Sequence, residues 1–137
     1  MRSVDAMLLD VDAAAVQHDA TFAAGKLLAL AEEVLEHWIA ARGEIPTSER
    51  REQFRLLGLH HQGARGVPSF NACRETCREI AYHHNLLCLE PASEQTIGRQ
   101  RMMAMLVRHL ALFVTGKMQV EGLGEFCCAS RPLRLES

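Results

Sequence analysis

The sequence has few aromatic residues, little net charge and no long apolar run. Aromatic side chains make up 5% of the 137 residues, with Trp38 and Tyr82 as the only residues of their types. Because 48% of the residues are nevertheless hydrophobic, the core must consist mainly of aliphatic and sulfur-containing side chains. The length fits one domain that needs no disulfide to be stable.

The low net charge and the absence of long apolar runs exclude several classes of binding partner. A formal charge of −2 gives the molecule no general attraction to nucleic acid or to an anionic membrane. No apolar stretch approaches the ~18 residues of a membrane span, and Asp5 and Asp10 interrupt the segment where a signal peptide would lie. We therefore expect a cytoplasmic protein without membrane contact, whose cysteines are thiols or ligands rather than disulfides.

Familiar catalytic motifs are also missing. The sequence has no phosphate-binding or dinucleotide-binding glycine pattern and no nucleophile elbow. Glu32, Glu33 and Glu36 fall on the expected solvent face of a helix rather than at the centre of a buried face. The sequence thus favours a binding or sensing protein over an enzyme.

Helical spacing of apolar residues recurs in four segments separated by proline, glycine and serine. We expect helices at 10–42 or 19–42, at 48–60, at 69–90 and at 93–116. Gly43 and Gly116 suit positions just after a helix, and Pro91 disfavours helical geometry in the residue before it. The sequence predicts an all-α, antiparallel four-helix bundle in 1–116 and an irregular tail or short hairpin in 117–137.

The long amphipathic helices and the tail offer apolar surface that a second copy can cover. We therefore expect a homodimer. The tail is expected to pack on the bundle or to contact a protein partner. It contains Cys127 and Cys128, which form either an exposed thiol pair or part of an ordinary packed segment.

Sulfur and imidazole side chains line one face of the third predicted helix. At 100° per residue, Cys73, Cys77, His84 and Cys88 lie within roughly 60° of one another. Cys73 and Cys88 are about 22 Å apart along the axis, so the four residues form two separate i,i+4 pairs. A disulfide within either pair would require the helix to unwind, because i,i+4 Cβ atoms lie about 5–6 Å apart and a disulfide needs about 3.8 Å.

A hairpin about Pro91 would bring the fourth helix to this stripe. We expect that helix to bury a face that includes Met105 and His109. Residues equally distant from Pro91 would meet, which places Met105 opposite Cys77 and His109 opposite Cys73. Two thiolates, a thioether and an imidazole suit Cu(I), or Zn(II) if the thioether is left out. The predicted metal ligands are Cys73, Cys77, Met105 and His109, or else His84 and Cys88.

Three interpretations of the stripe remain open. It holds a soft metal, it is a redox thiol site, or its residues only pack the core of a ligand-free dimeric interaction module. The His84-x-x-x-Cys88 spacing is similar to the ligand pair of copper-sensing helical repressors, over those five residues alone. By the same construction His84 would face Gly98, which leaves room for a small pocket.

The segment from Gly58 to Gly66 is a second candidate site. Its glycines allow backbone amides to converge on an anion, and His60, His61 and Arg65 add side-chain donors. The alternative is a plain helix connector.

Overall fold

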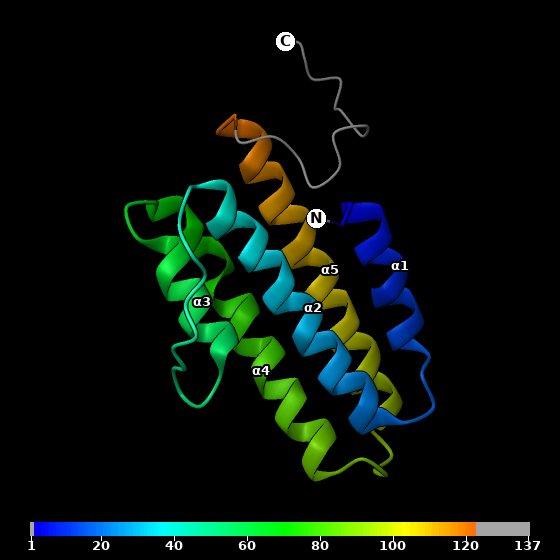
Figure 1. Ribbon diagram of the computed structural model, residues 1–137. Coiled ribbons are helices and arrows are strands. Elements are labelled where there is room, and N and C mark those ends of the chain that lie inside the picture. The colour runs from blue at the N-terminus through cyan, green and yellow to red at the C-terminus, as the bar shows by residue number, and fades with distance from the viewer. Residues whose placement is uncertain (1, 123–137) are drawn as a thin grey trace.

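The computed structural model describes residues 2–122, which form five α-helices and one 3₁₀ helix packed together (Figure 1). This confirms the all-α prediction, and no strand occurs within that range. The elements are α1 (Val4–Ala15), α2 (Ala20–Ala41), α3 (Arg55–Ala64), η1 (Pro68–Cys73), α4 (Arg74–Leu89) and α5 (Thr96–Val120). The tail from residue 123 onward, with Cys127 and Cys128, lies outside the described residues.

Four long helices run side by side, and α3 lies against α2 and α4 (Figure 1). The short connections after α1 and after α4 make α1/α2 and α4/α5 two antiparallel hairpins (Figure 1). The predicted hairpin about Pro91 is therefore present. Helix α2 packs against α1, α3, α4 and α5, and helix α5 packs against α1, α2 and α4.

The prediction of four helices undercounts because the first segment is broken in two. Helix α2 begins after this break, and Asp19 is its N-cap. The Asp19 carboxylate accepts a hydrogen bond from the Phe22 backbone N–H at 3.0 Å. On the other side, Gln100 donates from Nε2 to the carbonyls of Ala14 and Gln17, both at 2.8 Å. These bonds satisfy carbonyls at the end of α1, so the chain can turn there.

The second predicted helix, 48–60, is shifted along the chain. Residues before Phe54 are irregular, with positive φ at Glu52 and Gln53, and α3 begins only at Arg55. The glycines that indicated a loop after residue 58 instead allow close packing within a helix. An added Cβ at Gly58 would overlap the backbone of Glu49. An added Cβ at Gly63 would lie 2.9 Å from Trp38 Cδ1.

The remaining boundaries differ less. The segment from Ser69 starts as the 3₁₀ helix η1, and the α-helix begins at Arg74 and ends at Leu89, next to the predicted end. Helix α5 continues past Gly116 to Val120, so the first residues of the predicted tail are helical. In the described part of the chain, no helix is long and apolar enough to span a membrane.

Candidate functional site

A stack of three rings between α2, α3 and η1 supports the site. The Trp38 and Phe70 rings are nearly parallel, with centroids 4.7 Å apart. His60 stacks on the same Phe70 ring at 5.4 Å. Both Trp38 and Phe70 are fully buried, and the Trp38 indole N–H donates to the Gly63 carbonyl at 2.9 Å. This stack fixes the position of α3 relative to α2.

Two buried thiols lie beside this stack, at the junction of η1 and α4. The Cys73 thiol donates to the Phe70 carbonyl at 3.2 Å, and His60 Nε2 lies 3.1 Å from that same oxygen. Hydrogen bonding with Cys77 and contact with His60 lower the pKa of Cys73 to about 6, although burial opposes the shift. The interaction with Cys73, together with burial, raises the pKa of Cys77.

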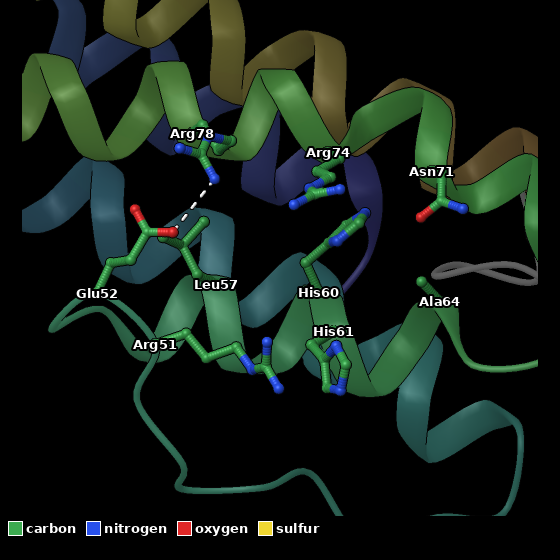
Figure 2. Close-up of a pocket in the computed structure, with 9 residues that line it drawn as sticks. All are labelled: Arg51, Glu52, Leu57, His60, His61, Ala64, Asn71, Arg74 and Arg78. Atoms are coloured by element: carbon green, nitrogen blue, oxygen red, sulfur yellow. Dashed lines mark hydrogen bonds and ion pairs between the residues drawn. The ribbon is translucent and has the colours of Figure 1, made fainter.

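A pocket of about 560 Å³ lies between α3 and α4, on the side of His60 that faces away from Phe70 (Figure 2). We call it the arginine pocket. It is lined by Arg51, Glu52, Leu57, His60, His61, Ala64, Asn71, Arg74 and Arg78. The side chains of Arg74 and His60 extend from opposite walls toward each other (Figure 2). Arg78 donates to the Glu52 carboxylate at 3.2 Å.

The charge in this pocket is unbalanced. Three guanidinium groups face one carboxylate, and Glu52 is already paired with Arg78. Arg51 approaches a carboxylate only at 4.0 Å, that of Glu49. Arg74 has no ion pair with any carboxylate in the range 2–122. The pocket therefore offers two guanidinium groups whose charge is largely uncompensated.

Two of the three predicted anion-binding residues line this pocket, and one does not. His60 and His61 are in its wall. Arg65 lies outside it and pairs with Glu44 at 3.1 Å. His60 and His61 lie in the helix α3 rather than in a loop, so side chains rather than converging backbone amides line the space.

The four-residue soft-metal set is not brought together. Cys73 and Cys77 are buried, but Met105 is 56% exposed and His109 also faces solvent. The predicted burial of Met105 and His109 is wrong because α5 packs through another face. That face consists of Met103, Val107, Leu110, Val114 and Met118.

The second predicted pair lies near the surface. Cys88 is exposed, and its sulfur lies 3.8 Å from His84 Nε2. His84 packs edge-on against Phe54, and partial burial lowers its pKa. An added Cβ at Gly98 would meet nothing within 4 Å, so His84 does not pack against Gly98 as the hairpin construction predicts. Residues 2–122 contain no group of three or more His, Cys, Asp or Glu side chains positioned for a metal ion.

Sequence reasoning missed the arginines of the pocket. Arg74 and Arg78 are one helical turn apart on the charged face of α4, and that face forms a pocket only because α3 lies against it. The signal available in the sequence was the i,i+4 arginine pair opposite a histidine pair. The glycines of the segment that contains the histidine pair predict a connector rather than a helix, so the sequence does not indicate that the two pairs face each other.

The glutamates of α2 were also misjudged. Glu33 accepts from the Arg2 guanidinium at 3.0 and 2.9 Å, which lowers its pKa. Arg55 contacts both Glu32 and Glu36. These carboxylates are half-buried and paired rather than solvated.

Comparison with known proteins identifies no relative of this chain. The chain matches no protein-family model, no curated protein and no solved structure.

Proposed function

We propose that this chain is a small helical binding protein whose ligand is an oxyanion, a phosphate or carboxylate group, held in the arginine pocket. The carrying observation is the uncompensated charge of Arg51 and Arg74 in a pocket of about 560 Å³. Ligand pockets commonly measure about 300–1,000 Å³, so a small phosphorylated or carboxylated molecule fits. The guanidinium group binds such oxyanions through two parallel hydrogen bonds.

The residues that line the pocket hold their side chains in positions that suit the binding of an oxyanion. His60 is held by stacking on Phe70 and by its contact with the Phe70 carbonyl. Asn71 supplies a neutral donor next to Arg74. A charge-assisted hydrogen bond contributes about 1.5–3 kcal/mol, and the exposure of Arg74 places its contribution at the lower end.

Thermal unfolding with inorganic phosphate tests the proposal. The control is sodium chloride at the same ionic strength, which screens surface charge without offering two acceptor oxygens. Phosphate at about ten times its dissociation constant stabilises by about 1.4 kcal/mol, a rise of roughly 5 °C for a chain of this size. No difference between the two salts up to high millimolar phosphate contradicts the proposal.

Arg74 and Arg65 provide a matched pair of variants. Arg74→Gln removes a pocket guanidinium, so we expect it to abolish most of the phosphate-dependent rise. Arg65→Gln removes an exposed guanidinium from the same region but outside the pocket, so the rise should persist. Equal loss in both variants would mean that phosphate acts through general charge rather than through this pocket.

A ligand-free homodimeric interaction module is the second candidate, and the outer face of α5 favours it. Met102, Met105 and Leu112 lie on one side of that helix and are 43%, 56% and 51% exposed. We propose a second copy as the partner, because one helix face can pack against itself about a two-fold axis. Light scattering after gel filtration should give a dimer for the native chain and a monomer for Met105→Glu. A native monomer at high micromolar concentration rules this candidate out.

The soft-metal function stays a prediction. Two of its expected ligands, Cys73 and Cys77, are adjacent and buried. Metal analysis of protein purified without added metal decides it.

A further inference from the structure

We propose that Cys73 and Cys77 are a dithiol that a peroxide oxidises to an intramolecular disulfide. This inference goes beyond anion binding and does not depend on it. It rests on where the two residues lie in the helix, on the groups around their sulfurs, and on their separation from the other described cysteine.

The position of Cys73 removes the main geometric objection to a disulfide. Between two residues inside a helix, an i,i+4 bridge requires unwinding, because the Cβ atoms must approach by roughly 1.5–2 Å. Cys73, however, is the N-cap of α4, with φ −97° and ψ 8°, and the preceding segment is a 3₁₀ helix. Only the first turn of α4 separates it from Cys77. The change from a 3₁₀ helix to an α-helix at Cys73 already interrupts the regular α-helical hydrogen bonds, so this turn can deform while the rest of α4 stays intact.

The surroundings of the two sulfurs assign them different roles. Cys73 lies at the N-terminus of α4, where the helix dipole favours a thiolate, and both its sulfur and His60 Nε2 lie within 3.2 Å of the Phe70 carbonyl oxygen. Cys77 is fully buried among apolar side chains, and its contact with Cys73 favours the protonated form. Cys73 is therefore the attacking sulfur and Cys77 the resolving thiol.

The reaction balances with peroxide as the oxidant. The Cys73 thiolate attacks one peroxide oxygen, the O–O bond breaks, and hydroxide leaves, which gives Cys73 sulfenic acid. Cys77 then loses its proton, its sulfur attacks the Cys73 sulfur, and the S–O bond breaks. Hydroxide and the proton leave as water. Two thiols and one hydrogen peroxide thus give one disulfide and two waters.

Burial makes this site selective. Cys73 is only 1% exposed, so oxidants reach it during local openings of the η1–α4 junction. Hydrogen peroxide is small enough to enter such an opening, whereas a maleimide reagent is too large to enter it. Cys88 is exposed and has no second described cysteine beside it. A maleimide should therefore label Cys88 first, and peroxide should form the disulfide at Cys73 and Cys77.

The test uses the full chain with Cys88→Ser, Cys127→Ser and Cys128→Ser, reduced, treated with a chelator and then exposed to hydrogen peroxide. Intact mass spectrometry should show a loss of about 2 Da, with both remaining thiols lost to titration. In this background Cys77→Ser should stop at the sulfenic acid, a gain of about 16 Da that dimedone traps. Cys73→Ser should react at least about tenfold more slowly, because its remaining thiol, Cys77, is fully buried among apolar side chains.

Three outcomes would overturn the inference. They are oxygen addition to both thiols without loss of mass, a disulfide between two chains, or equal peroxide rates in Cys73→Ser and Cys77→Ser. Circular dichroism confirms that each variant is folded. If a serine variant does not fold, the mass change of the three-serine background alone decides between the first two outcomes and the expected one. Unchanged mass after prolonged exposure to peroxide also refutes the proposal.

Discussion

Substituting Gly63 by alanine tests whether the ring stack is a rigid support for the arginine pocket. A Cβ at this position would lie 2.9 Å from Trp38 Cδ1, 3.1 Å from Trp38 Nε1 and 3.3 Å from Phe70 Cε2. Trp38 and Phe70 have 0% exposure and stack on each other, so neither ring has free space to move into. The substitution must strain the core or displace a ring.

The magnitude follows from three contributions. Overpacking a core costs about 1–3 kcal/mol. A shift of the indole weakens its hydrogen bond to the Gly63 carbonyl, a further loss of up to about 1 kcal/mol. Alanine recovers at most about 1 kcal/mol through its higher helix propensity. We expect a net loss of about 1–3 kcal/mol, which lowers the unfolding temperature by roughly 4–12 °C.

Gly25 supplies the matched control. It lies within α2, and an added Cβ there meets nothing within 4 Å. Gly25→Ala should therefore gain up to about 1 kcal/mol from propensity alone. Thermal and urea unfolding followed by circular dichroism measure both variants. If Gly63→Ala is as stable as the native chain while Gly25→Ala is stabilised, the rings can move aside and the stack is not rigid.

Three further predictions concern polar groups and their partners. Gln100→Leu leaves the carbonyls at the end of α1 without their donor and should cost about 1–3 kcal/mol in urea unfolding, whereas an equal midpoint would mean that water replaces the amide. Arg2 lowers the pKa of Glu33 in the folded state, so this ion pair stabilises above the usual pKa and the benefit is lost as the pH falls through the lowered one. Arg2→Gln should therefore be less stable than the native chain at neutral pH, and the gap in urea midpoints should shrink as the pH falls below the ordinary pKa of a glutamate; a constant gap contradicts the linkage. Cys77→Ala should raise the pKa of Cys73 above about 6. The ultraviolet absorbance of the thiolate measures this pKa in the background without other cysteines. An unchanged pKa would assign the shift to His60 alone.

The all-α class and the α4/α5 hairpin could be predicted because proline, capping residues and helical periodicity act locally. The end of α4 is one example, since Pro91 restricts the residue before it whatever the rest of the chain does. The buried side of Cys73 and Cys77 was also predictable, because charged residues occupy the opposite side of that helix. In each case the decisive residues lie within one or two turns of the feature.

The buried face of α5 was not predictable in this way. The helix is apolar on several sides, with Met102 and Met105 as plausible for the core as Met103 and Val107. Contact with α1, α2 and α4 selects the face, and those contacts are distant in the sequence. Gly63 shows the same limit. A glycine indicates either a turn or a close approach, and only the position of Trp38 decides between them.

The irregular connection between α2 and α3 has a consequence for a chain that is cleaved within it. Residues 44–50 have no regular structure and bridge two helices that Trp38 and Gly63 already join by a hydrogen bond. Both pieces of a chain cleaved there would keep their shared interface, since α2 packs against α3, α4 and α5. Fragments produced separately should reassemble on mixing, which makes this connection a natural place to divide the protein into two complementing halves.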